Sequence, residues 1–268
     1  MWNDPRAACL VVHRPCLTRA CQTETDRLHE PLRGRDPLRD RPHAHIAGIS
    51  HYSQDPTATS TPLAWARRYP AIGDTAEAVV ALQPDLVIAS IHTARATRLA
   101  LERLGVPLLL MGVPNSIAAS KQQIAEIGTA IGAEAAAARL NARINAAVAQ
   151  ARTNAAPVPV LLRQLSGLVP GRGTLVDELM RTAGLRNASA DYGLNTWDIL
   201  PLEYLVARPP RALLTDTTSD PRATRHPVFR RMAAHIVIRD YPDKLLRCGG
   251  PTIIPALARL QEIRDTRL

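Results

Sequence analysis

Short apolar runs alternate with longer segments of helical periodicity from about residue 46 onward. Continuous apolar runs bounded by Gly, Pro or polar residues are typical of buried parallel strands in α/β domains. They predict strands at residues 46–50, 85–89 and 107–111. Helices are expected at residues 74–82, where Asp74 and Glu77 form a capping pair, and at residues 93–104. These elements predict a first α/β lobe over residues 46–115.

The next segment, residues 116–154, keeps an approximately helical apolar period for much longer than an ordinary connecting helix. Gly128 and Gly132 interrupt it and are expected to bend it. We therefore predict one long helix that links two lobes, within residues 116–156.

A second alternation of strands and helices follows Pro157 and Pro159 and predicts a second lobe over residues 157–268. Thr174 and Asp177 form a capping pair for a helix that Gly184 ends. The other predicted elements are a strand at 160–165, a helix at 201–207, a strand at 212–215, a short helix near Val228, a strand at 235–238 and a helix at 251–263. The fold class is thus α/β, with two Rossmann-like lobes joined by a long backbone helix.

One short sequence pattern is repeated in the two lobes. Glu77 precedes Pro84 by the same interval that separates Glu203 from Pro210, and an apolar strand follows each proline. A glutamate in a first helical turn is favoured by the helix dipole, so simple capping is one explanation. The repetition at equivalent places in both lobes leaves a shared functional role open.

The charge distribution argues against nucleic-acid binding. The net charge is +9, but basic residues are spread along the chain and aromatic residues make up only 3%. The four cysteines lack the paired spacing of a zinc site, and no disulfide framework is expected. The apolar run at residues 7–12 is too short for the apolar core of a signal peptide.

No motif for catalysis is found: a Ser/His/Asp nucleophile elbow, paired catalytic carboxylates and a nucleotide-binding P-loop are all missing from the sequence. We therefore expect a protein that is not an enzyme. The alternative is a metal-dependent α/β enzyme that uses the histidines, although none has the spacing of a known metal motif. These are His43, His45, His51 and His92.

Ligand-binding candidates cluster after predicted strands. In open α/β sheets ligands bind at the carboxyl ends of the strands. His51 and Tyr52 follow the first strand, and His92 and Thr93 follow the second. Aromatic residues are scarce, so Tyr52 and Trp197, which is expected in a loop before the helix at 201–207, are candidate stacking surfaces. The glycine-rich loop at 170–174, with Gly173, is either an anion-binding loop or a turn before a capped helix.

From about residue 46 to the end, the chain resembles the class III periplasmic substrate-binding proteins of iron-siderophore and cobalamin ABC importers. The order and spacing of the matching stretches carry this resemblance. They are residues 46–52, 77–90, 104–107, 116–132, 171–175, 183–187 and 248–251.

The resemblance implies that the ligand is held in a cleft between two lobes with little hinge motion. The ligand is expected to be a corrinoid or a ferric chelate, with no resident cofactor and no metal site of the protein's own. Tyr52 and Trp197 match positions that line this cleft in cobalamin-binding relatives, with Arg247 or Arg172 available for an anionic group. Glu77 and Glu203 match glutamates that dock onto the membrane permease. The resemblance also implies a periplasmic protein, which we expect to be a monomer.

Residues 1–45 depart from the family pattern. They are rich in Arg and Pro and show no coherent period, where relatives have a signal peptide, a first strand and a helix. Shifted by one nucleotide, permitted codons for residues 23–42 can read P-K-R-I-V-S-M-N-L-C-A-D-E-I-L-F-A-I-A-P. We therefore predict a disordered or frame-shifted segment and a missing first strand, and a third alternative for the whole chain is a non-functional remnant. The nucleotide sequence of the gene across this segment decides between these readings.

Overall fold

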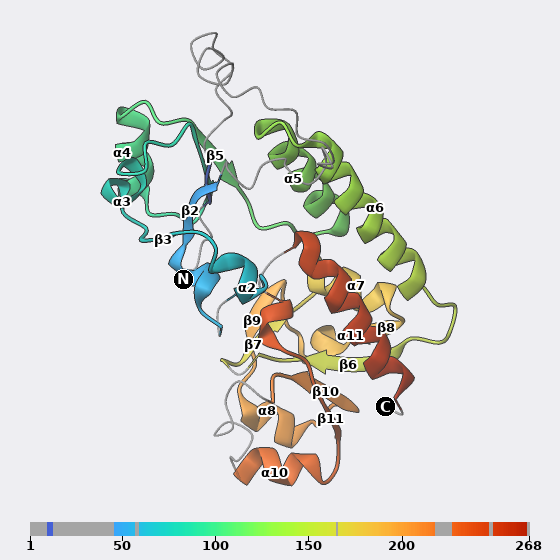
Figure 1. Ribbon diagram of the computed structural model, residues 1–268. Coiled ribbons are helices and arrows are strands. Elements are labelled where there is room, and N and C mark those ends of the chain that lie inside the picture. Colours follow the sequence, from blue (N-terminus) through green and yellow to red (C-terminus); the bar gives the residue numbers. More distant parts are fainter. Residues whose placement is uncertain are drawn as a thin grey trace, which may run out of the picture. The chain divides into compact units, whose positions relative to one another are not determined.

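The computed structural model describes residues 10–12, 46–56, 59–164, 166–217, 227–246 and 249–266. The chain divides into two compact units, residues 1–112 and 113–268, each of which is α/β (Figure 1). Within the described ranges, every helix is too short or too polar to span a lipid bilayer.

The first unit is built on a five-stranded sheet with the order β3-β2-β1-β4-β5. Four of its strands are β2 (Ile46–Ser50), β3 (Ala71–Ile72), β4 (Leu86–Ser90) and β5 (Leu108–Met111). β2 pairs in parallel with β3, and β4 pairs in parallel with β5. Three of these strands were predicted to within one residue. β3 was not predicted, because two residues carry no periodic signal.

The centre of this sheet is occupied by β1 (Leu10–Val12), which belongs to the apolar run of the N-terminal segment. β1 is antiparallel to both β2 and β4, with an irregularity between Val11 and Val12. No strand was predicted there, and a vacant first-strand position was expected. The structure instead places a three-residue strand between the two parallel pairs.

Helices cover both faces of the first sheet. α3 (Ala76–Val80) and α4 (Arg95–Arg103) pack their apolar side chains against Val87 and Ala89 of β4. On the other face, α2 (Leu63–Ala66) packs against Ile49. The N-cap of α3 is Thr75 and not the predicted Asp74, because the Thr75 hydroxyl accepts the Ala78 amide hydrogen.

The predicted single helix over residues 116–154 is two helices, α5 (Ile117–Ala130) and α6 (Glu134–Ala151). The chain reverses at Gly132, whose positive φ of 66° is a conformation that only glycine adopts at little cost. The two helices then pack side by side: the Lys121 ammonium donates to Asn145 Oδ1 at 2.7 Å. Both helices belong to the second unit.

The second unit contains a parallel sheet with the order β11-β10-β6-β8. Its strands are β6 (Val158–Leu162), β8 (Leu185–Asn187), β10 (Ala212–Thr215) and β11 (Val237–Asp240). Alternate side chains of β6 enter different cores, since Val160 and Leu162 join one cluster and Leu161 joins the other. This alternation shows that the sheet is covered on both faces.

The helices of the second unit separate accordingly. α5, α6, α7 (Leu175–Thr182) and α11 (Ile253–Asp265) pack on one face of the sheet. α8 (Leu202–Ala207) and α10 (Pro227–Ala233) lie on the other face (Figure 1). The predicted cap of α7 is confirmed, because Thr174 Oγ1 accepts the Asp177 amide hydrogen at 3.1 Å.

A two-stranded antiparallel ribbon completes this unit. It consists of β7 (Leu168–Pro170) and β9 (Trp197–Ile199). The prediction that Trp197 lies in a loop is therefore wrong, because Trp197 is the first residue of β9 and pairs with Pro170. The remaining short helices are η2 (His51–Gln54), η3 (Ala188–Tyr192), η4 (Asp243–Leu245) and η5 (Gly250–Thr252).

Candidate ligand-binding sites

Four predicted ligand residues of the first unit lie at one edge of its sheet. β2 and β4 run in the same direction, because β1 is antiparallel to both of them. His51 and Tyr52 follow the carboxyl end of β2, and His92 and Thr93 follow that of β4. The sheet topology therefore brings all four to the edge at which open α/β sheets bind ligands.

His51 and Tyr52 form a compact pair of aromatic side chains. Their ring centroids are 4.0 Å apart, with His51 exposed and Tyr52 half-buried. His51 Nδ1 lies 3.2 Å from the carbonyl oxygen of Ile72, and 4.0 Å from Asp74 Oδ1. A carbonyl oxygen only accepts hydrogen bonds, so Nδ1 carries the proton in this contact. In the neutral imidazole the lone pair is then on Nε2, the arrangement seen in metal-ligating histidines.

His92 and Thr93 contribute differently. His92 is exposed, and its backbone N–H donates to Ser90 Oγ at 3.1 Å. The Thr93 backbone N–H donates to the Ser90 carbonyl oxygen at 2.9 Å. Ser90 thus holds the turn after β4, and the turn presents the His92 side chain to solvent. Among the described residues, no three His, Cys, Asp or Glu side chains are placed to hold a metal ion.

In the second unit, the β7–β9 ribbon connects two predicted ligand positions. Trp197 is half-buried and packs against the core formed with α7 and α11. The Gly171 amide donates to the Thr196 carbonyl at 2.8 Å, which joins the glycine-rich loop to the start of β9. Gly173, two residues further along, is exposed with a positive φ of 77°. The structure therefore brings the glycine-rich loop and the Trp197 strand together.

Two buried polar side chains anchor this ribbon. Asn187 donates from Nδ2 to the Pro170 carbonyl oxygen at 2.8 Å, which fixes the end of β7. Arg163 donates from Nε to the Leu200 carbonyl oxygen, also at 2.8 Å, directly after β9. Arg163 was not among the predicted site residues, because it falls within the predicted strand at 160–165. A charged residue directly after an apolar strand was the available signal.

The two glutamates of the repeated sequence pattern, Glu77 and Glu203, are both exposed. Each lies in the first turn of a helix, Glu77 in α3 and Glu203 in α8. The pKa of the Glu77 carboxyl is lowered by a hydrogen bond from its own backbone N–H and by one from Thr75. Its negative charge is thereby favoured at neutral pH. Around Glu203, large apolar side chains are exposed: Ile199, Tyr204 and Val206.

Two arginines, Arg172 and Arg247, were predicted to be available for an anionic group. Arg247 lies outside the described residues. Arg172 is exposed in the glycine-rich loop. It contributes, after the directly bonded Arg186, to the positive charge that lowers the pKa of the Asp191 carboxyl.

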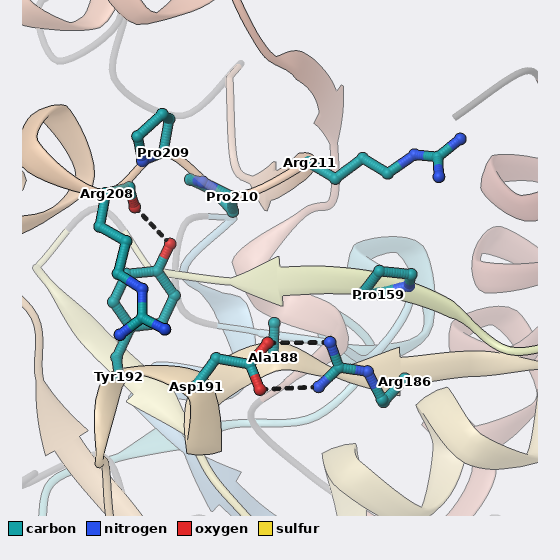
Figure 2. A pocket seen from close by; sticks show the side chains of 9 residues that line it. All are labelled: Pro159, Arg186, Ala188, Asp191, Tyr192, Arg208, Pro209, Pro210 and Arg211. Atoms are coloured by element: carbon teal, nitrogen blue, oxygen red, sulfur yellow. Dashed lines mark hydrogen bonds and ion pairs between the residues drawn. The ribbon is translucent and has the colours of Figure 1, made fainter.

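A separate pocket of about 170 Å³ is lined by residues at the amino ends of β6 and β10, by β8 and by the short helix η3 that follows β8 (Figure 2). In it, Arg186 forms a bidentate ion pair with Asp191 at 2.8 Å, and Tyr192 donates to the Arg208 carbonyl oxygen at 2.7 Å. The Arg208 guanidinium lies 5.9 Å from the centre of the Tyr192 ring. None of the predicted ligand residues that the structure describes lines this pocket. At β6 and β10 the pocket lies at the ends opposite to the edge where α/β sheets bind ligands.

Comparison with known proteins identifies the family and the fold of the chain. The family model described as periplasmic binding protein matches residues 42–235, most of the chain. The chain belongs to the periplasmic binding protein family. The family's sequence pattern thus begins just before β2 and runs through α10.

Solved structures share this fold. The periplasmic heme-binding protein RhuT from Roseiflexus sp. RS-1 is 27% identical, with 78% of this chain and 88% of that chain covered and a TM-score of 0.61. The heme-binding protein BhuT, solved with two hemes, is 25% identical over 78% of this chain and 85% of that chain, with a TM-score of 0.62. The vitamin B12-binding protein BtuF of Vibrio cholerae is 16% identical over 81% and 88%, with a TM-score of 0.60, and supports the fold alone. A comparison with curated protein sequences returned no match.

Proposed function

We propose that this protein is the substrate-binding component of an ABC importer in the periplasm, and that its ligand is a tetrapyrrole metal chelate, with heme favoured over a corrinoid. Membership of the periplasmic binding protein family carries the proposal. Heme is favoured because two similar structures, at 27% and 25% identity, are heme-binding proteins.

The pair His51 and Tyr52 supports iron-chelate binding on chemical grounds. Histidine imidazole and tyrosine phenolate both serve as axial ligands of heme iron. The hydrogen bond from His51 Nδ1 to Ile72 orients the imidazole, while Tyr52 supplies a half-buried ring that can also stack on a macrocycle. In the second unit, Trp197 is a further aromatic side chain that could stack on a macrocycle.

Tyr52→Phe tests the proposed ligand contact. The change keeps the ring and removes the phenolic oxygen, so we expect hemin to bind roughly tenfold or more weakly, with an altered heme absorption spectrum. Hemin titration of the purified protein, followed by absorbance, measures both effects. Tyr204→Phe is the matched control, because Tyr204 is 62% exposed on α8. Equal affinity and equal spectra for Tyr52→Phe and the wild type would exclude Tyr52 as an iron ligand.

Parallel titrations identify the ligand class. Cyanocobalamin and ferrichrome, each followed by tryptophan fluorescence, represent the corrinoid and siderophore alternatives. Saturable binding of hemin with weaker binding of the other two is the expected result. If all three fail to bind, the ligand proposal is rejected, and metal-dependent turnover would favour the enzyme alternative.

The exposed Glu77 and Glu203 support docking onto a permease, since acidic side chains on each unit could pair with basic side chains of a partner. Reversing both charges, with Glu77→Arg and Glu203→Arg, is expected to abolish capture by the cognate ABC permease in nanodiscs. Glu102→Arg, which is also exposed, serves as the control. Undiminished capture of the doubly reversed protein would contradict this role.

A further inference from the structure

Arg163 is a buried cation at the carboxyl end of β6. Its side chain is only 9% exposed, and among the described residues no carboxylate forms an ion pair with it within 4.0 Å. Burying a guanidinium is costly unless its N–H groups are hydrogen-bonded. Arg163 meets this requirement with main-chain oxygens, through Nε to Leu200 at 2.8 Å and Nη1 to Gln164 at 3.3 Å.

These bonds hold a short, strategically placed segment. Leu200 follows β9, which begins at Trp197, and precedes α8, which carries Glu203 in its first turn. The Leu200 amide in turn donates to the Gly167 carbonyl oxygen at 2.9 Å, so both polar groups of the Leu200 backbone are bonded. A single buried arginine therefore fixes the midpoint between the candidate ligand ring and the candidate docking carboxylate.

The charge of Glu203 also affects the Arg163 guanidinium. Burial lowers the pKa of the Arg163 guanidinium, and the negative charge of Glu203 opposes that shift. The exposed carboxylate thus compensates part of the buried positive charge.

We propose that Arg163 is a positioning residue that fixes the segment from Trp197 to Glu203, so that ligand contact at one end is coupled to the docking carboxylate at the other. This inference rests on the proposed function. Coupling of this kind is reciprocal: if Arg163 transmits it, the charge of Glu203 changes ligand affinity as well as docking.

The test uses hemin affinity in four proteins: wild type, Arg163→Met, Glu203→Gln and the double variant. Methionine keeps much of the arginine volume and removes its donors. We expect Arg163→Met to weaken hemin binding roughly two- to thirtyfold. Glu203→Gln is expected to shift hemin affinity in the wild-type background and to have no further effect once Arg163 is replaced. Arg163→Lys keeps the positive charge and replaces the guanidinium with a single ammonium group. It should therefore bind hemin more tightly than Arg163→Met does.

A purely structural role gives a different pattern. If Arg163→Met only lowers the urea midpoint, with hemin affinity unchanged well below the transition, the positioning role is rejected. Equal effects of Glu203→Gln in both backgrounds also reject it. Should Arg163→Met fail to fold, the same comparison is made with Arg163→Lys, and equal effects of Glu203→Gln on hemin affinity in the wild-type and Arg163→Lys backgrounds reject the coupling.

The proposed function and this inference fail separately. A protein with Trp2→Phe and Trp65→Phe retains Trp197 as its single tryptophan. In the ligand-free form, Arg163→Met is expected to shift its emission, and Glu203→Gln to shift it only when Arg163 is present. If these shifts occur but hemin, cyanocobalamin and ferrichrome do not bind, the proposed function is wrong and the contact between Arg163 and the segment stands. Missing shifts together with normal hemin binding reject the inference alone.

Discussion

Ile144→Ala in α6 is expected to destabilise the second unit by about 2–5 kcal/mol, the usual cost of truncating a buried isoleucine. Ile144 is fully buried, in the core cluster that also contains Ile117 of α5 and Leu257 of α11. Its removal leaves a cavity between the helical pair and the helices that cover the sheet. The large effect is expected because α6 is part of the second unit's core and does not serve as a solvated connector.

Urea unfolding followed by Trp197 fluorescence measures this loss, in a background where Trp2 and Trp65 are phenylalanine. Arg143→Ala is the matched control, one residue earlier on the exposed side of α6. It is expected to change the free energy of unfolding by less than about 0.5 kcal/mol. Similar unfolding free energies for the two variants would show that α6 does not contribute to this core.

The break between α5 and α6 illustrates what the apolar pattern predicts poorly. The helical period of apolar residues continues on both sides of Gly132, so the pattern alone favoured one helix. The reversal depends on non-local packing: a Cβ on Gly128 would lie 2.5 Å from Ala137 Cβ, which shows how closely the helices approach. Ile117 N–H also donates to Glu178 Oε2 at 2.7 Å, a bond between residues 61 positions apart. Such contacts leave no periodic signal in the sequence.

The candidate site residues differ in the same way: some are located by the local sequence pattern and others by contacts with distant residues. The location of four candidate residues at one sheet edge could be predicted, because they lie just after apolar strands and parallel strands share one carboxyl edge. They are His51, Tyr52, His92 and Thr93. The strand that carries Trp197 could not, since its partner Leu168–Pro170 lies far away in the sequence and each strand has only three residues. Arg163 is significant only through the carbonyl oxygen of Leu200, 37 residues later.

The strand β1 differs in length and direction from its two neighbours in the first sheet. β2 and β4 have five residues each and run parallel, whereas β1 between them has three and runs antiparallel to both. Antiparallel strands in otherwise parallel α/β sheets are usually found at an edge. The alternative reading frame of residues 23–42 lies outside the described residues, so the frame-shift hypothesis remains a prediction about the gene.

Gly171→Ala is expected to damage both stability and ligand binding, because no side chain fits at this position. A Cβ on Gly171 would collide with the carbonyl oxygen of Asn195, and would also come within 2.8 Å of the Asn195 carbonyl carbon. These are backbone atoms, which cannot rotate away as the end of a side chain can. The loop and the start of β9 must separate, which disrupts the bond from Gly171 N–H to Thr196. We expect a loss of about 3 kcal/mol in unfolding free energy.

The same displacement moves Trp197, which follows Thr196 directly, so hemin affinity should fall roughly tenfold or more if Trp197 contacts the ligand. Gly193→Ala separates this clash from the general cost of an alanine at a glycine position. Gly193 has a positive φ of 69°, but nothing lies within 4 Å of its built Cβ. Its replacement is expected to cost about 1–2 kcal/mol through backbone strain alone, with hemin affinity unchanged. Gly171→Ala with full hemin affinity would mean that Trp197 makes no contact with the ligand, whereas equal losses of stability in both variants would mean that the loop yields without disturbing β9.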